Sequence, residues 1–383
     1  MRSCYFDNAA TSWPKPRSVM RAMEAYFRRG GGNPGRSGHI KAVDAGRVVL
    51  ETREIIAKLF NVRDSSRIVF TKNATEALNI AIHGFVREGD HVVTTSMEHN
   101  SVMRPLRFLE ERGARVNVVQ SDPEGRVDAD ALSRELEKNT RLLIFTHASN
   151  VTGTINDIEA VGKLCRERSV PLLVDAAQTA GVIPVDVEKL SCDFLAFSGH
   201  KGLLGPQGTG GLFIREGISL DSVMQGGTGS LSDREVQPDF LPDRYESGTL
   251  NVIGIAGLAA GVRFLLQRGV QSVQKHDREL LALFFNAIGS DERIRTYGKG
   301  KGSEQTGVLS LNIAGLSPSK VGDLLDRRYG IMTRIGLHCA PGAHRSIGTF
   351  PDGTVRFSWG LFTRKREVLY AARALREIAA GAD

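Results

Sequence analysis

The sequence has few cysteines, and their spacing argues against stabilisation by disulfide bonds or by a structural zinc ion. Only four occur among 383 residues, at Cys4, Cys165, Cys192 and Cys339. They lie far apart and form no Cys-x-x-Cys pair, so neither a disulfide framework nor a zinc site is expected. We therefore predict that the chain binds no metal.

Long apolar runs are missing as well. No stretch reaches the ~18 consecutive apolar residues that a membrane span needs, and residues 1–7 contain no apolar core of a signal peptide. We expect no membrane partner and a cytoplasmic location, where thiols stay reduced.

The chain also lacks a strong excess of one charge. Its 50 Lys and Arg residues against 43 Asp and Glu residues give a net charge of +7. Basic residues are interleaved with acidic ones, and no basic stripe with interleaved aromatic residues occurs, so we expect no nucleic-acid partner. The modest positive charge favours small anionic ligands.

Between residues 66 and 216, short β-rich runs alternate with helical patterns. Most runs are continuously apolar, which is typical of strands covered on both faces and predicts a mostly parallel wound sheet in an α/β fold. The runs are residues 67–71, 91–94, 116–119, 141–146, 171–174, 192–197 and 211–214. Ligands gather at the carboxyl ends of such strands, so the residues that follow them are the candidate site.

After Leu250 the pattern changes to two helical stretches, followed by strands at residues 308–313 and 354–358 and a final helical stripe. This arrangement favours a smaller α+β domain. We predict a large α/β domain over residues 17–250, a small domain over residues 251–383, and an N-terminal segment, residues 1–16, that joins them.

A lysine follows the strand 192–197 in the turn Ser198-Gly199-His200-Lys201. A lysine amine becomes an effective nucleophile when a partly desolvated cleft lowers its pKa or an imine holds its nitrogen. Ser198 and His200 offer donors that suit a phosphate. The alternative interpretation is a surface lysine in a glycine-rich turn.

Asp175 ends another apolar run, in Val174-Asp175-Ala176-Ala177-Gln178. A carboxylate at the end of a buried strand is costly without a cation, and a protonated pyridine nitrogen is such a partner. Capping of a helix is the alternative, since Asp favours that position.

Two further strand ends carry polar residues. Ala74 and Thr75 open a helical pattern, and the free N–H groups of a helix N-terminus, with the Thr75 hydroxyl, favour a phosphate. Simple capping by Asn73 is the alternative. His99 could stack on a planar ring or serve a purely structural role.

Taken together, these segments resemble the class V, fold-type I pyridoxal phosphate enzymes. Within that class the chain most resembles the cysteine desulfurases, through a nucleophilic-cysteine motif and a substrate-arginine segment. The matching segments run in order along nearly the whole chain: residues 7–11, 73–77, 98–100, 149–153, 175–178, 198–201, 247–251, 334–340 and 355–358.

The resemblance implies a role for each matching residue. Lys201 is the Schiff-base lysine and proton shuttle, Asp175 contacts the pyridine nitrogen, Gln178 the phenolic oxygen, and His99 stacks on the ring. Asn150 and Arg356 meet the substrate, and a planar guanidinium suits a carboxylate, although an ordinary salt bridge of Arg356 is the alternative. Phosphate contacts are expected from Ala74, Thr75, Ser198 and His200, and from Thr249 of a neighbouring subunit in a homodimer.

Cys339 decides the expected reaction. By resemblance its thiolate takes sulfur from L-cysteine as a persulfide, and L-alanine is released. Arg334 and His338 are near enough in sequence to favour the thiolate, although the sequence does not show that they point towards it. A small buried apolar role is the alternative for Cys339.

Seventeen positions separate Cys339 from Arg356 (356 minus 339), as in the group with a short cysteine loop. Such a loop has limited reach, so a sulfur-acceptor protein or a small thiol is expected to come to the site, as in iron–sulfur cluster assembly. The alternatives are a selenocysteine lyase acting on L-selenocysteine, another class V aminotransferase or lyase, and a non-catalytic α/β binding module.

Overall fold

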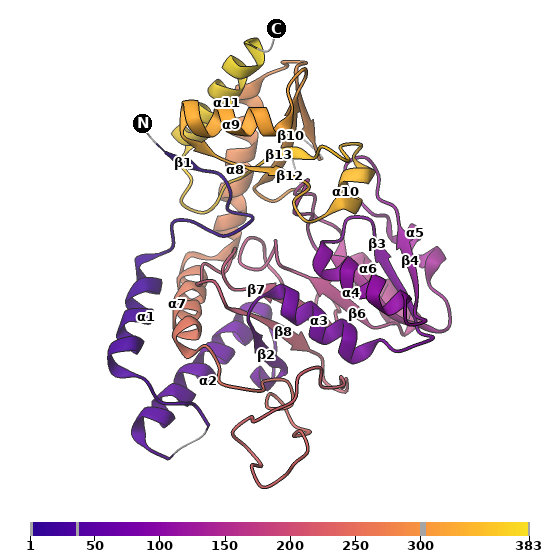
Figure 1. Ribbon diagram of the computed structural model, residues 1–383, viewed down its shortest axis with the longest axis vertical. Coiled ribbons are helices and arrows are strands. Elements are labelled where there is room, and N and C mark those ends of the chain that lie inside the picture. Colours follow the sequence, from indigo (N-terminus) through magenta and orange to yellow (C-terminus); the bar gives the residue numbers. More distant parts are fainter. Residues whose placement is uncertain (1–2, 36–37, 299–303, 382–383) are drawn as a thin grey trace.

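The computed structural model describes residues 3–35, 38–298 and 304–381. A seven-stranded sheet forms its larger layer, in the strand order β2-β8-β7-β6-β5-β3-β4 (Figure 1). All neighbours are parallel except β8, which runs antiparallel to β2 and β7. The predicted mostly parallel wound sheet is confirmed. The strands are β2 (Ile68–Thr71), β3 (His91–Thr95), β4 (Arg115–Val119), β5 (Thr140–Thr146), β6 (Leu172–Asp175), β7 (Phe194–Ser198) and β8 (Gly210–Ile214).

Helices cover both faces of this sheet, because side chains along each central strand alternate between two apolar cores. In β5, Leu142 and Ile144 pack with α3 (Ala74–Phe85) and α4 (Asn100–Glu110). Leu143 and Phe145 face the opposite core. That second core contains residues of α2 (Ile40–Phe60), α5 (Ala129–Glu135), α6 (Ile158–Arg168) and α7 (Val252–Arg268). Helix α1 (Arg17–Arg29) packs on α7.

Side-chain caps fix where several helices begin. The Asn73 side chain accepts a hydrogen bond from the Glu76 backbone nitrogen at the start of α3, and Asn251 caps α7 in the same way through Gly254. These bonds satisfy backbone donors that have no partner within the helix. The start of α3 is therefore set by its own sequence, next to the end of β2.

A four-stranded antiparallel sheet of order β12-β13-β10-β9 forms the second layer, covered by α8, α9 and α11. Its elements are α8 (Val270–Ile288), β9 (Ile294–Tyr297), β10 (Val308–Ile313), α9 (Pro318–Tyr329), β12 (Arg334–Gly336), β13 (Thr354–Ser358) and α11 (Lys365–Ala380). The core of this layer is separate, and includes Cys4 and Phe6 from the N-terminal segment. Helix α10 (Pro341–Ser346) lies between β12 and β13 in the sequence and packs with the core of the large layer through Ala343.

The N-terminal segment joins the small layer as a strand. Here β1 (Cys4–Tyr5) pairs in parallel with β11 (Ile331–Met332). Helix α7 packs with the large sheet although it lies beyond residue 250. The division of the chain into two domains at that residue stays a prediction.

Across the described ranges no single helix is long and apolar enough to span a membrane. Helices α7 and α8 reach the required length and hydropathy only as a pair, which is bent by 79°.

A buried ion pair fastens α2 to the loop that precedes α7. The two terminal nitrogens of Arg53 lie 2.7 and 2.8 Å from the two carboxylate oxygens of Glu246, and both residues are buried. Glu246 also accepts a hydrogen bond of 2.6 Å from the Phe70 backbone nitrogen, and Arg53 donates to the Ile68 carbonyl. One pair therefore connects α2, β2 and this loop.

Replacing Arg53 with leucine should destabilise the protein by ~3–5 kcal/mol, because the buried Glu246 carboxyl would lose its charged partner. Urea unfolding of the purified protein would measure the loss. The double variant Arg53→Leu/Glu246→Leu should recover much of the stability, since no unpaired charge remains. A single variant as stable as the unchanged protein would contradict this role.

Candidate active site

A cavity of about 230 Å³ opens at the carboxyl ends of the large sheet's strands, beside the small layer. All the predicted site residues line it except Cys339 and Thr249. Those brought together are Ala74, Thr75, His99, Asn150, Asp175, Gln178, Ser198, His200, Lys201 and Arg356. Segments far apart in the sequence therefore meet where the sheet topology places the ends of β2, β3, β5, β6 and β7.

Lys201 enters the cavity from the turn that follows β7. Burial lowers its pKa to about 8, and Arg356 and Arg334 act in the same direction, while Asp175 opposes them. A lysine with this pKa has an appreciable neutral fraction near pH 8. Its amine can therefore act as a nucleophile and exchange a proton at Nζ.

Two acids lie under the cavity. Asp175 is buried at the end of β6, and its carboxylate accepts a hydrogen bond of 2.8 Å from the Ala177 backbone nitrogen. Burial raises its pKa, while that bond and the nearby Lys201 lower it. Within the described residues no cation forms a salt bridge with it.

Glu98 is the second acid. It belongs to the matching segment of residues 98–100, but the sequence pattern assigned it no role. Its Oε1 accepts hydrogen bonds from the Thr95 hydroxyl at 2.8 Å and the Thr146 backbone nitrogen at 2.9 Å. Burial raises its pKa to about 8 against these bonds, and Asp175 raises it further. Glu98 is therefore mainly uncharged at pH 7.

One wall of the cavity is rich in hydrogen-bond donors. The Ala74 backbone nitrogen donates to the Ser198 hydroxyl at 3.2 Å, which joins the start of α3 to the end of β7. The Thr75 and Ser101 hydroxyls lie 2.8 Å apart. Gly210 allows this approach, because a Cβ there would lie 2.7 Å from the Asn73 backbone.

His99 caps α4 with its own ring. Its Nδ1 lies 3.0 Å from the Ser101 backbone nitrogen and accepts from it, so the neutral ring carries its proton on Nε2. Burial lowers its pKa to about 4, and Lys201, Arg334 and Arg356 add to the shift. The structural role and the predicted ring-facing role of His99 are therefore compatible.

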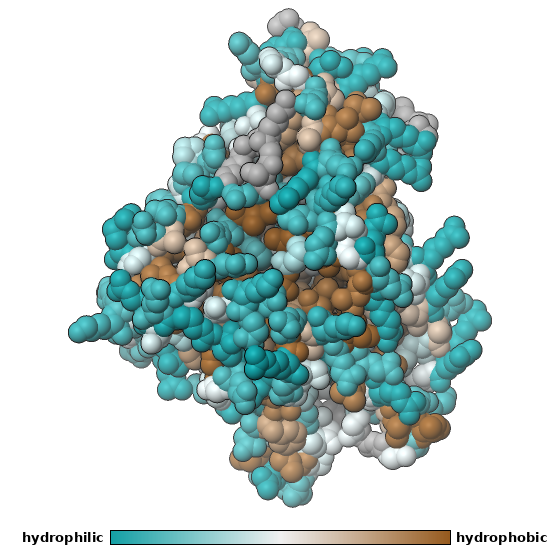
Figure 2. Space-filling model, turned by 180° about the vertical axis from the view of Figure 1, so that it is seen from behind, coloured by the Kyte–Doolittle hydropathy of each residue, from teal (hydrophilic) through white to brown (hydrophobic). Residues whose placement is uncertain are grey.

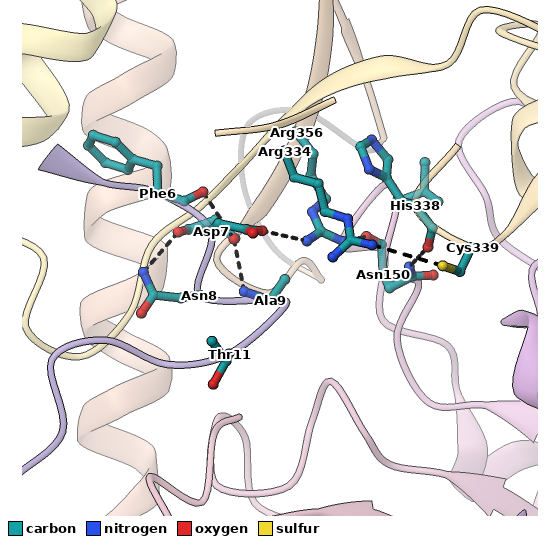
Figure 3. A network of polar contacts seen from close by, with 12 residues as sticks. Phe6, Asp7, Asn8, Ala9, Thr11, Asn150, Arg334, His338, Cys339 and Arg356 are labelled. Carbon is teal, nitrogen blue, oxygen red and sulfur yellow. Dashed lines mark hydrogen bonds and ion pairs between the residues drawn. The ribbon is translucent and has the colours of Figure 1, made fainter. Parts of the chain in front are cut away.

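Arg356 is buried between the two layers (Figure 3). It donates to the Asn150 carbonyl at 3.0 Å and to the Asp7 carboxylate at 2.8 Å, so the salt bridge considered as an alternative does exist. Its Nε has no partner among the described residues. Burial lowers the pKa of Arg356 and Asp7 opposes this shift. The guanidinium lines the cavity and retains a donor.

Cys339 is exposed on a turn between β12 and α10, where His338 and Cys339 both have left-handed backbones with φ of 49° and 61°. Arg334 Nη2 lies 3.9 Å from its sulfur (Figure 3). The His338 ring instead lies 2.9 Å from the Thr354 hydroxyl, and burial lowers its pKa to about 2. Of the two neighbours considered, Arg334 is the one that contacts the sulfur.

The other three cysteines are buried. Burial raises the pKa of Cys165 and that of Cys192 to about 12. A low-dielectric surrounding opposes the thiolate form at both positions.

Thr249 lies away from the cavity of its own chain. It is exposed on the loop before α7, where its hydroxyl lies 3.4 Å from the Asn33 side-chain nitrogen. Its predicted contact with the site of a neighbouring subunit stays a prediction.

A model of the family described as aminotransferase class-V matches residues 4–370. The chain belongs to the class-V aminotransferase family. A probable cysteine desulfurase from Methanothermobacter thermautotrophicus is 37% identical to it over 99% of this chain and 96% of that protein. Another, from Pyrococcus abyssi, is 36% identical over 95% of this chain and 91% of that protein.

A comparison with solved structures agrees with this assignment. The apo structure of a cysteine desulfurase from Thermococcus onnurineus superposes with a TM-score of 0.93 at 34% identity, covering 99% of this chain and 95% of that one. The resemblance to cysteine desulfurases and the fold-type I architecture are confirmed. The chain is an enzyme, and the interpretation as a non-catalytic binding module is set aside.

The buried acid Glu98 should make stability fall as pH rises. Folded Glu98 keeps a proton up to about pH 8, whereas its unperturbed pKa is 4.5, so the folded chain holds the extra proton between these values. Raising the pH from about 5 to about 8 should therefore lower the free energy of unfolding less in Glu98→Gln than in the unchanged protein. Urea unfolding at several pH values would measure the difference.

Glu111→Gln provides the matched control, since Glu111 is exposed at the end of α4. It should follow the pH dependence of the unchanged protein. Equal slopes for Glu98→Gln and Glu111→Gln would rule out the uncharged state assigned to Glu98.

Proposed function

We propose that the chain is a pyridoxal phosphate-dependent cysteine desulfurase that converts L-cysteine to L-alanine and accepts the sulfur on Cys339. The observation that carries the proposal is the joint placement of three groups. Lys201 and Arg356 line one cavity, and the exposed Cys339 lies at its rim with Arg334 3.9 Å from the sulfur. The names of the relatives support the same activity.

The residues of the cavity fit pyridoxal phosphate. Asp175 is buried and forms no salt bridge with the described residues, and a protonated ring nitrogen would supply a charged partner. The N-terminus of α3 and the hydroxyls of Thr75 and Ser198 suit the phosphate, and the buried His200 Nδ1 has no partner in the described structure. When bound, the cofactor supplies an aldehyde that joins an amine and a ring that takes up electrons.

The remaining cavity residues have roles that follow from their positions. Gln178 donates to the Ala9 carbonyl at 3.2 Å, and this bond fixes the amide that would contact the phenolic oxygen of the cofactor. The uncharged His99 ring would lie against the cofactor ring without adding a charge. Arg356 and Asn150 orient the substrate carboxylate, with the Asn150 amide itself fixed to the His338 carbonyl at 2.6 Å.

Lys201 moves the proton in this scheme. Its pKa of about 8 lets Nζ accept a proton from the substrate α-carbon and return one near neutral pH. The Cys339 thiolate then attacks the substrate sulfur, so that an S–S bond forms as the C–S bond breaks. The electron pair of the broken bond goes to carbon, which takes a proton, and the products are alanine and a persulfide on Cys339.

The sulfur leaves by way of an acceptor that comes to Cys339. The Asn100 backbone nitrogen donates to the Cys339 carbonyl at 2.8 Å, and the Ser346 hydroxyl donates to that of Ser96 at 2.8 Å. These two hydrogen bonds connect the segment of residues 339–346 to the large layer at both of its ends. A tethered sulfur cannot travel far, which supports a visiting protein or small thiol.

A homodimer is part of the proposal. Helices α1 and α2 expose large apolar side chains, namely Met20, Phe27, Ile40, Val43 and Leu50. Elsewhere, on the face shown in Figure 2, hydrophilic side chains dominate and apolar ones form separate patches. A second copy would cover the helices and bring Thr249 to the neighbouring site.

Cys339→Ala should lower alanine formation from L-cysteine by a factor of ~100 or more, because the attacking thiolate is lost. The visible absorption of the bound cofactor should remain. An alanine assay, with mass analysis of the peptide that contains Cys339, would show the loss of both product and added sulfur.

Cys165→Ala, which removes a buried thiol, should keep the activity. Sulfide release that persists unchanged in Cys339→Ala, with cofactor still bound, would refute the role of this cysteine.

Arg334→Met should slow alkylation of Cys339 by iodoacetamide at pH 7 by ~5-fold, because the guanidinium 3.9 Å from the sulfur no longer attracts the electron-rich attacking sulfur. The rate can be followed by mass spectrometry. Arg345→Met is the control, since Arg345 packs on Phe350 and not on the sulfur. Equal rates in the two variants would show that Arg334 does not activate the thiol.

A further inference from the structure

Four donor atoms of the N-terminal segment surround one carbonyl oxygen, that of His200. The Ser12 backbone nitrogen and the Lys15 ammonium nitrogen each lie 3.1 Å from it. The hydroxyl oxygens of Thr11 and Ser12 each lie 3.2 Å from it. A carbonyl oxygen has two lone pairs, so two donors would satisfy it. The peptide bond that this carbonyl begins leads directly into Lys201.

Lys15 makes the charged contact of the four. Its ammonium also donates to the Ser12 carbonyl at 3.1 Å and the Ser12 hydroxyl at 2.9 Å, so its three protons match three acceptors. Burial lowers its pKa to about 8, and no carboxylate in the described part of the chain forms a salt bridge with it. Pro14 and Pro16 flank Lys15 and restrict its backbone. The partly desolvated Lys15 ammonium is thus held in contact with the neutral His200 carbonyl.

Backbone hydrogen bonds within the turn, and one to the residue before β8, fix the same turn independently of the N-terminal segment. The Gly199 nitrogen donates to the Thr209 carbonyl at 2.8 Å, and the Gly205 nitrogen to the Gly199 carbonyl at 2.8 Å. The Leu204 nitrogen donates to the Lys201 carbonyl at 2.9 Å. The turn that contains the His200–Lys201 peptide is therefore fixed both by its own hydrogen bonds and by the N-terminal segment.

We propose that Lys15 is a positioning residue for Lys201: its ammonium fixes the His200 carbonyl and so holds the peptide from which the Lys201 side chain enters the cavity. The proposal rests on the proposed function for its kinetic consequence. Lys15 lies outside the set that holds the substrate carboxylate, so its loss affects turnover and leaves substrate binding intact.

The decisive experiment is hydrogen–deuterium exchange of the full chain without added cofactor. Lys15→Met should speed exchange of the amides of Leu204 and Gly205 by ~10-fold, the effect of losing one charge-assisted hydrogen bond that closes the turn. Lys15→Arg, which keeps the charge and the donors, should stay within ~3-fold of the unchanged protein. Lys163→Met, at an exposed position of α6, is the control and should leave the turn unchanged.

Turnover of L-cysteine by the loaded enzyme gives the second readout. Lys15→Met should lower kcat by ~10-fold with KM within ~2-fold, because only the placement of Lys201 changes. If the unchanged protein makes no alanine, the proposed function fails, and the exchange data alone decide the role of Lys15.

If the amides of Leu204 and Gly205 exchange at the same rate in Lys15→Met as in the unchanged protein, the proposal is overturned, whatever the effect on activity. If circular dichroism shows that Lys15→Met does not fold, Lys15→Gln replaces the ammonium with a neutral donor at the same position. It should speed exchange of the same two amides by ~3-fold, as expected for a weaker bond. No acceleration there would overturn the proposal equally.

Discussion

Desolvation at the carboxyl edge of the seven-stranded sheet sets the charge state of the groups in this site. It lowers the pKa of Lys201 to about 8 and keeps Glu98 protonated near neutral pH. It also makes the His99 ring neutral. Water in the same place would restore ordinary pKa values and remove the neutral lysine on which the chemistry depends. The tight junction of the two layers is thus a chemical requirement as well as a structural one.

The sequence allowed much of this edge to be predicted, for a physical reason. Parallel strands end on one side of their sheet, so Asp175, Lys201 and the start of α3 could be expected to meet without any knowledge of packing. The family resemblance added Arg356 and Cys339, which come from the other layer. The cysteine lies beside the cavity and not in its wall, on a turn where His338 and Cys339 have left-handed backbones that the sequence pattern does not reveal.

Other features depend on long-range contacts that no local pattern encodes. Glu98 is neutral because strands from several parts of the chain enclose it. Lys15 reaches a carbonyl 185 positions further along the sequence, and a Pro-Lys-Pro segment by itself resembles any surface loop. The apolar pattern predicts which segments are buried, but it does not predict the direction of a strand or the element on which a helix packs. The antiparallel direction of β8 and the packing of α7 on the large sheet could therefore not be predicted.

Burial of three of the four cysteine sulfurs makes the folded protein suitable for selective chemical labelling. Cys4, Cys165 and Cys192 are enclosed, while Cys339 faces outward. A soft electrophile supplied in limiting amount will therefore tag a single position on each folded polypeptide. Cys339 is therefore a natural labelling site, to which a fluorophore or crosslinker can be attached without first replacing the other cysteines.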